Sequence, residues 1–274
     1  FNEQFILGEI IAQSLEAAGV QVERRFGFGS TALIHGALAN GQIDLYVEYT
    51  GTGAEAVLEM RERLPRDRVL EALRNNYERR FHATWLAPLG FENSYAIVVR
   101  QEDAEARGWR RVSDLQSVSG SLRAGFTSEF FERLDGYPRL RTHYGFGFGH
   151  AITLDAGLMY DALRRTNVDL ISGFLSDGRI DASRLVALED DRSFFPAYDA
   201  VPVVRLDALQ RFPALRPALE GLAGRFSLTA MRAMNFEVDT GATTAAEIAR
   251  KFLAAPASRS LDMGTTRPRA TGAA

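Results

Sequence analysis

The 274-residue sequence has no cysteine, a single lysine (Lys251), four histidines and no run of 18 apolar residues. The lack of cysteine excludes disulfides, thiolate metal sites and cysteine nucleophiles, and it leaves the cellular compartment open. The lack of a long apolar run excludes a membrane-spanning helix within this sequence. We interpret the near absence of lysine as a bias of genome composition, which says little about mechanism.

An excess of charge of one sign is also lacking, because 32 basic residues oppose 35 acidic ones and the formal net charge is -3. Such a chain has no basic field to hold nucleic acid or an anionic bilayer by bulk electrostatics, so neither is expected as a partner. Hydrophobic residues make up 46% of the sequence, which is enough for a sizeable core. The length is that of one large domain or of two lobes.

Helical and strand-like patterns alternate along the sequence, which indicates an α/β layer architecture. Apolar residues at helical spacing predict a helix over 3–18, and 20–26 alternates like a strand. A helix capped by Ser30 or Thr31 and a strand over 43–47 follow. Further helices are expected at 65–80, 155–165, 206–210, 216–222, 229–237 and 244–253, and further strands at 95–99, 168–171, 185–188 and 201–205, the last returning to an earlier sheet.

No motif in the sequence demands an enzyme. Gly27–Thr31 could hold an anion before a helix, but it lacks the third glycine of a dinucleotide fingerprint and the Gly-Lys pair of a phosphate loop. A simple turn, or an oxygen-binding turn for a small ligand, is preferred there, and Gly145–Gly149 is interpreted as a loop. Metal-ligand spacing and a Gly-x-Ser-x-Gly elbow are both missing, so we expect no metal, no cofactor and no catalytic residue. The histidines are His35, His82, His143 and His150.

Aromatic residues stand beside glycine, proline, asparagine or other polar residues in segments that otherwise have the composition of turns. One interpretation is that these rings belong to the core and close the ends of strands. The other is that several aromatic faces near an arginine suit a ligand with a permanent cation and a carboxylate. The pattern leaves both interpretations open. The segments are 48–53, 91–95, 126–133, 173–178 and 194–198.

Six segments that occur in order resemble the substrate-binding proteins of ABC importers for glycine betaine, choline, carnitine and related osmoprotectants. Any one of these segments is a weak signal, whereas the ordered set is specific. The resemblance extends over residues 1–254. The segments are Phe-Asn-Glu-Gln at 1–4, the run from Gly41 to Gly53, Pro88 to Ala96, Arg133 to Tyr137, Ser176 to Ile180 and Asp190 to Tyr198.

The resemblance implies a two-lobed periplasmic-binding-protein fold (type II), of the α/β class, with the ligand cleft between the lobes. Lobe 1 is expected to comprise residues 1–89 and 200–254, and lobe 2 residues 90–199. The remaining residues, 255–274, are rich in Pro, Arg, Ser, Thr, Gly and Ala without periodicity, and we expect a flexible tail there.

In this family a box of aromatic rings surrounds a quaternary ammonium group, and the matching positions here are Tyr49, Tyr95, Phe174 and Tyr198. Arg133 matches the carboxylate-binding arginine and Thr52 matches a hydroxyl that assists it. Phe174 departs from the usual tyrosine, so the ring is kept and a hydroxyl is lost. The family's lysine before Phe-x-Glu-Gln would precede Phe1 and is not assigned.

The resemblance predicts a non-enzymatic binding subunit that delivers a betaine-like solute to the permease subunits of an ABC importer. We expect a monomer, periplasmic or extracellular and membrane-anchored, whose export signal is not visible in this sequence. Three alternatives stay open: a binding protein for a bulkier trimethylated amino acid or another solute, a ligand-sensing domain on the same fold, and an enzyme on a two-lobed scaffold.

Overall fold

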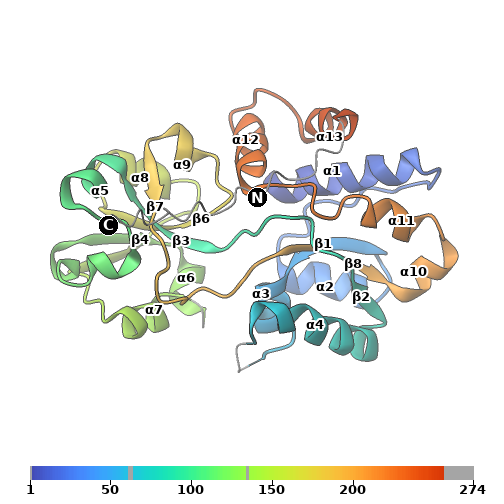
Figure 1. Cartoon of the computed structure of the whole chain (residues 1–274), viewed down its shortest axis with the longest axis horizontal. Coiled ribbons are helices and arrows are strands. Elements are labelled where there is room, and N and C mark those ends of the chain that lie inside the picture. Colours follow the sequence, from blue (N-terminus) through green and yellow to red (C-terminus); the bar gives the residue numbers. More distant parts are fainter. Residues whose placement is uncertain (1, 61–63, 134–135, 256–274) are drawn as a thin grey trace, which may run out of the picture.

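Two β-sheets organise the chain in the computed structural model, which describes residues 2–60, 64–133 and 136–255 (Figure 1). In these residues the smaller sheet has the strand order β1-β8-β2 and the larger one the order β5-β4-β6-β3-β7. The expected α/β class is therefore correct. The smaller sheet consists of β1 (Leu45–Tyr49), β8 (Ala200–Arg205) and β2 (Ala83–Trp85), and the larger of β5 (His150–Thr153), β4 (Arg123–Phe126), β6 (Leu170–Phe174), β3 (Tyr95–Arg100) and β7 (Leu185–Ala187).

Helices surround both sheets, and those near each sheet come from different parts of the chain (Figure 1). The smaller sheet lies with α1 (Asn2–Ala17), α2 (Thr31–Ala39), α3 (Thr50–Thr52), η1 (Gly53–Val57), α4 (Arg66–Phe81), α10 (Leu206–Arg211), α11 (Leu215–Glu220), α12 (Leu228–Asp239) and α13 (Ala245–Ala254). The larger sheet lies with α5 (Gln101–Arg107), η2 (Val112–Leu115), η3 (Ser119–Ser121), α6 (Ser128–Glu132), α7 (Tyr137–Tyr144), α8 (Met159–Arg164) and α9 (Arg179–Ala182).

Local sequence signals explain where several of these helices begin and end. Ser30 caps α2, because its Oγ accepts the backbone N–H of Leu33. Pro65 precedes α4, and Gly19 follows α1 with a φ of 81°, a left-handed conformation that favours glycine. The apolar positions of α1 are buried as its periodicity predicts, and they form the stripe Ile6, Leu7, Ile10, Ile11 and Leu15.

Strand β8 confirms that the chain returns to an earlier sheet, since it pairs antiparallel with both β1 and β2. Two crossover segments, 86–94 and 188–199, connect the sheets and run side by side (Figure 1). The Asn93 N–H donates to Tyr198 O at 3.0 Å, and Glu92 and Asp199 form an antiparallel bridge. We use lobe 1 for residues 1–89 with 200–254 and lobe 2 for 90–199; these boundaries stay a prediction. Of the expected tail, residues 256–274 lie outside the described residues.

The strand expected at 20–26 is wrong, because this segment is irregular and forms no sheet ladder. Val20 and Val22 pack against the core under α1, which accounts for the alternating pattern without backbone pairing. The helix expected at 155–165 begins only at Met159, since residues before it form a turn in which Asp155 Oδ1 accepts the Gly157 N–H at 2.7 Å.

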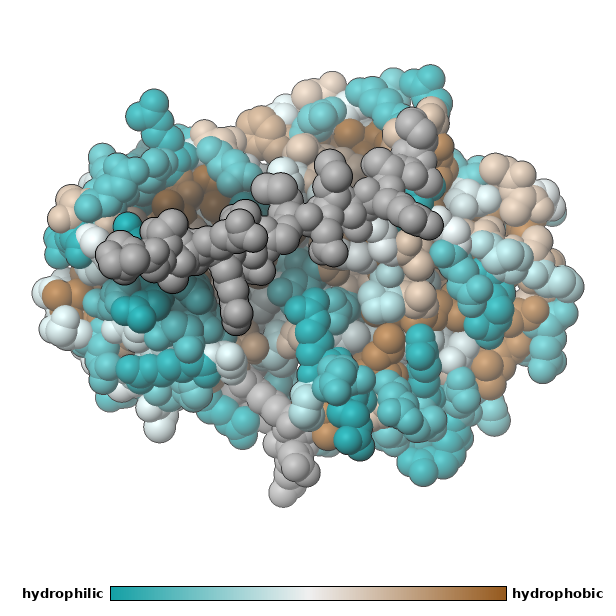
Figure 2. Space-filling model, in the orientation of Figure 1, coloured by the Kyte–Doolittle hydropathy of each residue, from teal (hydrophilic) through white to brown (hydrophobic). Residues whose placement is uncertain are grey.

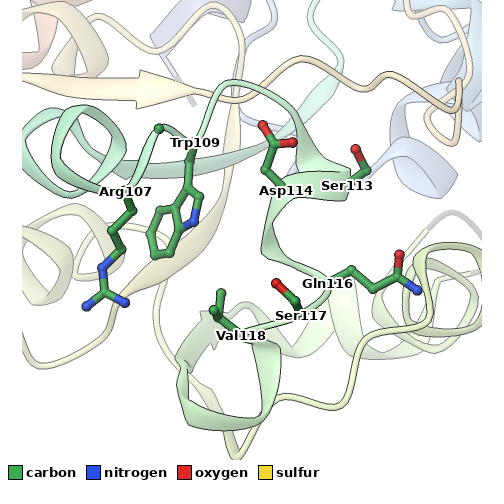
Figure 3. A pocket seen from close by; sticks show the side chains of 8 residues that line it. Arg107, Trp109, Ser113, Asp114, Gln116, Ser117 and Val118 are labelled. Atoms are coloured by element: carbon green, nitrogen blue, oxygen red, sulfur yellow. The ribbon is translucent and has the colours of Figure 1, made fainter.

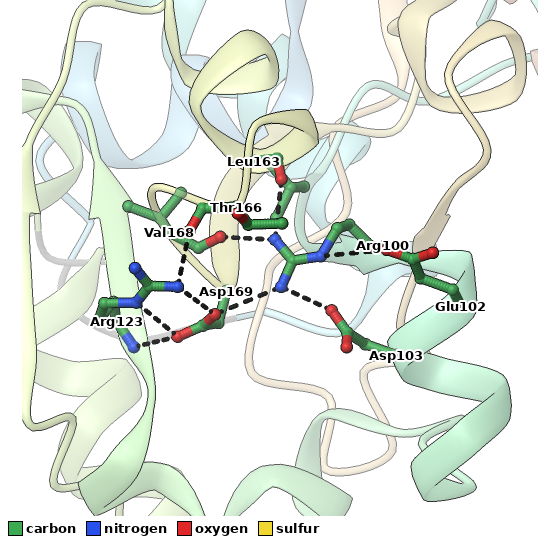
Figure 4. Close-up of polar contacts among 8 residues, drawn as sticks. All are labelled: Arg100, Glu102, Asp103, Arg123, Leu163, Thr166, Val168 and Asp169. Carbon is green, nitrogen blue, oxygen red and sulfur yellow. Dashed lines mark hydrogen bonds and ion pairs between the residues drawn. The ribbon is translucent and has the colours of Figure 1, made fainter.

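A buried arginine fixes one end of the larger sheet (Figure 4). Arg100, at the end of β3, donates to the carbonyl oxygens of Leu163 (2.8 Å) and Val168 (2.7 Å) and pairs with Asp169 at 3.3 Å. Burial opposes ionisation of Asp169, but hydrogen bonds from Arg123 and Arg100 outweigh it and lower its pKa to about 2. Strands β3 and β6 are antiparallel, and Tyr95 and Phe174 are paired at one end of them. The network of Arg100 and Asp169 lies at the other end, where it holds the two strands together.

The surface matches the balanced composition of the chain. On the face shown in Figure 2, hydrophobic residues form small patches between hydrophilic ones. None of the helices in the described parts of the chain is both long and apolar enough to cross a bilayer.

Candidate ligand-binding cleft

A cavity of about 1260 Å³ is lined by residues of both lobes and of the crossover segments. It brings together all six residues that the sequence predicts for the site. Lobe 1 contributes Tyr49 and Thr52, and lobe 2 contributes Tyr95, Arg133, Phe174 and the crossover residue Tyr198.

Three of the four predicted rings are close together on the cavity wall. Tyr95 and Phe174 are register partners on β3 and β6, and their ring centroids are 4.7 Å apart. Tyr198 meets Tyr95 edge-on, with centroids 6.4 Å apart and planes at 85°. Two more rings, Phe130 and Phe195, pack against Tyr95 without lining the cavity, and their centroids lie 5.0 and 6.2 Å from that of Tyr95.

Tyr49 lines the same cavity from the end of β1. The residue is 9% exposed, and its hydroxyl donates a hydrogen bond to the Glu3 carboxylate and accepts one from Gln4 Nε2 at 3.2 Å. Burial, with the nearby Glu3 charge, raises the pKa of Tyr49 well above its usual value, so the phenol stays protonated. Its hydroxyl is therefore fixed as the donor toward Glu3.

The structure supports the first interpretation, in which the rings belong to the core, and the ligand-binding interpretation stays a prediction. Tyr49 and Tyr198 belong to a hydrophobic core under α1, and Tyr95 belongs to the core of the larger sheet with Phe174 packed against it. Tyr95 and Tyr198 are only 7% and 3% exposed. These rings thus close the ends of strands and present part of their surface to the cavity.

Arg133 lies with its guanidinium beside two of the predicted rings. It follows α6, whose N-cap Thr127 accepts the Phe130 N–H at 3.1 Å. Its Cζ lies 5.6 Å from the centroid of the Tyr95 ring, and its Nη2 donates to the Tyr198 hydroxyl at 3.2 Å. Its Nη1 pairs with Glu129 at 3.2 Å. Arg133 therefore joins two of the rings at the cavity wall.

Buried polar residues behind the rings were missed by sequence reasoning. Glu3, in the first turn of α1, is fully buried and accepts hydrogen bonds from Tyr49, Asn93 and Asn235. A signal did exist, because Glu3 is a carboxylate three residues before Ile6, on the apolar stripe of the helix. Asn93 and Ser176 lie in the segments that carry the family resemblance, but the sequence analysis assigned no role to either residue.

Glu48 is a second buried acid that lines the cavity. Its carboxylate accepts the Tyr49 N–H at 2.8 Å and the Tyr46 hydroxyl at 3.3 Å. Burial raises the pKa of Glu48 to about 7, and the hydrogen bonds and the positive charge of Arg133 only partly oppose it. The site therefore contains an acid that titrates near neutral pH.

A separate cavity of about 760 Å³ lies on the outside of lobe 2 and contains none of the predicted residues (Figure 3). Its lining includes Arg107, Trp109 and Asp114. The cleft, by contrast, combines aromatic faces, the guanidinium of Arg133 and buried carboxylates, which can hold an organic cation that carries an acidic group. Within the described ranges no three His, Cys, Asp or Glu side chains are placed to hold a metal ion.

The chain matches known proteins over most of its length. Residues 1–255 match the model of the substrate binding domain of ABC-type glycine betaine transport system. A carnitine transport binding protein of Listeria monocytogenes is 33% identical over 255 residues, covering 92% of this chain and 83% of that protein. A glycine-betaine-binding protein of Pseudomonas aeruginosa is 33% identical over 264 residues, covering 92% and 84%.

A solved structure shows the same architecture. The crystal structure of a glycine betaine/carnitine/choline ABC transporter protein superimposes with a TM-score of 0.82 at 31% sequence identity, covering 92% of this chain and 94% of the other. The two-lobed periplasmic-binding-protein fold of type II is therefore that of this chain. On the family match and these relatives, the chain belongs to the family of substrate-binding domains of ABC-type glycine betaine transport systems.

Proposed function

We propose that the chain captures a quaternary-ammonium osmoprotectant, glycine betaine or a related betaine or choline, in a box formed by Tyr49, Tyr95, Phe174 and Tyr198. One observation carries the proposal: Tyr95, Phe174 and Tyr198 converge on the wall of one cavity, and Arg133 lies 5.6 Å from the Tyr95 ring. Arg133, assisted by Thr52, would hold the carboxylate of a zwitterionic ligand.

The chemistry of the trimethylammonium group explains why rings are suited to it. This group has no N–H to donate, so it is recognised through the negative faces of aromatic rings rather than by hydrogen bonds. Each desolvated contact contributes up to about 2 kcal/mol. Several such contacts and a guanidinium-carboxylate pair are sufficient for the roughly -8 kcal/mol of micromolar binding, after the costs of ordering.

The family's members are extracytoplasmic binding proteins of ABC transporters that work with permease subunits. We propose the same role here, as a monomer that is periplasmic or held at the outer face of a membrane. The ligand is passed on unchanged in this role, so we propose that the chain is not an enzyme.

A second candidate ligand is a bulkier trimethylated amino acid. The cavity of about 1260 Å³ supports this alternative, because it continues beyond the six site residues along 20–31. Phe174 also supports a bulkier ligand, because it leaves space where the hydroxyl of the family's usual tyrosine would lie.

Calorimetry of the purified chain tests both candidates. We expect saturable binding of at least one of glycine betaine, proline betaine, choline, carnitine or a bulkier trimethylated amino acid, and no binding of glycine. The ligand should be recovered chemically unchanged. A chain that binds none of the trimethylated compounds contradicts the proposal, and recovery of a new product would indicate an enzyme.

A further inference from the structure

The Glu3 carboxylate connects both lobes behind the proposed box. It accepts the hydroxyl of Tyr49 from β1, the Nδ2 of Asn93 at 3.3 Å from a crossover segment, and the Nδ2 of Asn235 at 2.9 Å from α12. Asn235 also donates to the carbonyl oxygen of Ser176, just after β6. The segments that carry Tyr49, Tyr95 and Phe174 are thus gathered around one carboxylate.

The hydrogen bonds of Glu3 are those of an ionised carboxylate. Asn93 Oδ1 accepts the Ser176 N–H at 3.2 Å, and Asn235 Nδ2 donates to the Ser176 carbonyl at 2.9 Å. Because backbone groups have fixed polarity, these bonds orient both amides with their NH₂ groups toward Glu3. Gln4 donates to Tyr49, which in turn donates to Glu3. Three donors therefore converge on Glu3, the arrangement of an acceptor-only group.

This buried charge has no cationic partner among the described residues. The arginines that line the cleft pair with other acids: Arg133 with Glu129, Arg179 with Asp177 at 2.6 Å, Arg24 with Glu9 and Arg25 with Glu23. The N-terminus of α1 supplies only a partial positive charge. Burial raises the pKa of Glu3 although its hydrogen bonds oppose the shift, and a cation bound nearby would favour the ionised carboxylate and offset the cost of its burial.

We propose that Glu3 is the counter-charge of the bound quaternary ammonium group and the residue that positions Tyr49 in the box. The inference rests on the proposed function, because it assigns a partner to the cation of that ligand. The Tyr49 phenol lies between the two charges, since its hydroxyl contacts Glu3 and its ring lines the cavity. Glu3 thus selects for the positive charge of the ligand, whereas the rings alone would also accept a neutral group of the same shape.

The experiment compares each cation with its neutral carbon isostere: glycine betaine with 3,3-dimethylbutanoate, and choline with 3,3-dimethylbutan-1-ol. Binding is measured for the wild type, for Glu3→Gln, and for Glu9→Gln as a matched control on the same helix, where Glu9 pairs with Arg24 at 2.9 Å. We expect Glu3→Gln to lower affinity for the cation about tenfold or more and to change affinity for the isostere little. Glu9→Gln should leave the ratio of the two affinities at the wild-type value.

An equal loss for cation and isostere in Glu3→Gln would mean that Glu3 only supports the fold, and it would overturn the proposal. If Glu3→Gln does not fold, the double variant Glu3→Gln with Asn235→Asp is tested instead. It exchanges the amide and the carboxylate between two side chains that are joined by a hydrogen bond of 2.9 Å. We expect this exchange to keep the preference for the cation; a folded exchange variant without that preference overturns the proposal. A wild type that binds no trimethylammonium compound refutes the proposed function instead.

Discussion

Arg133 offers the most direct test of ligand class at the scale of a single residue. Replacing it with alanine removes the guanidinium that would pair with a ligand carboxylate. We therefore expect Arg133→Ala to weaken glycine betaine binding by about 1.5 to 3 kcal/mol, and choline binding less, because choline has no carboxylate. Titration calorimetry with both ligands measures the difference.

The control for this variant is Arg192→Ala, which removes a guanidinium that lies 5.1 Å from the Tyr144 ring, away from the cleft-lining residues. We expect the control to bind both ligands as the wild type does. Equal losses for glycine betaine and choline in Arg133→Ala would indicate that Arg133 supports Tyr95 and Tyr198 rather than holding a carboxylate.

Glu48 makes stability depend on pH. Burial raises its pKa from 4.5 to about 7 in the folded chain, so between these values the folded state binds more protons at this site than the unfolded state. The free energy of unfolding therefore falls as pH rises through this window, by up to about 1.4 kcal/mol per pH unit. We expect Glu48→Gln to reduce this slope in denaturant titrations between about pH 5 and pH 7.

The matched control is Glu102→Gln, because the Glu102 side chain is 79% exposed and forms only a distant ion pair with Arg100 at 3.9 Å. This variant should keep the slope of the wild type. A slope that Glu48→Gln leaves unchanged would assign the titration to another acid.

At the scale of elements, the short helix α3 determines where the Tyr198 ring can lie. A Cβ on Gly51 would be 2.5 Å from Tyr198 Cε1. Gly51→Ala must therefore displace the ring, and we expect it to destabilise the fold by about 1 to 3 kcal/mol. Betaine binding should weaken at the same time, because the displaced ring opens the box. Thermal melting and calorimetry measure the two effects.

Gly36 in α2 provides the comparison, because a Cβ there would have no neighbour within 4 Å. Gly36→Ala should stabilise the chain by about 0.4 to 1 kcal/mol through helix propensity and reduced unfolded-state entropy. Its ligand affinity should not change. If Gly51→Ala behaves like Gly36→Ala, α3 does not constrain the ring.

At the scale of the whole molecule, ligand binding should appear as thermal stabilisation. Free ligand at 100 times its dissociation constant stabilises the folded state by about 2.7 kcal/mol. For a chain of this size that corresponds to a rise in melting temperature of roughly 5 °C. We expect this rise with a trimethylated betaine and little or none with glycine, whose ammonium group would have to give up strong hydration. A rise of the same size with glycine would argue against recognition of the methyl groups.

Tertiary structure also accounts for the errors made from local patterns. Val20 and Val22 alternate with polar residues as a strand would, yet their side chains pack under α1 while the backbone pairs with no strand. Alternation reports which side chains are buried, and it does not report whether a neighbouring strand is present to complete a ladder.

The sequence by itself determined the α/β class, the longest helices, the cap of α2, the return of β8 and the family, because these depend on local periodicity and on short ordered motifs. The family resemblance also named six of the residues that line the cleft. Only the tertiary structure decided which partners those residues have: Glu3 and Asn235 are 232 positions apart, and their hydrogen bond exists because α1 and α12 pack together. Hydrogen-bond partners and charge compensation depend on such long-range packing, and no local pattern in the sequence encodes them.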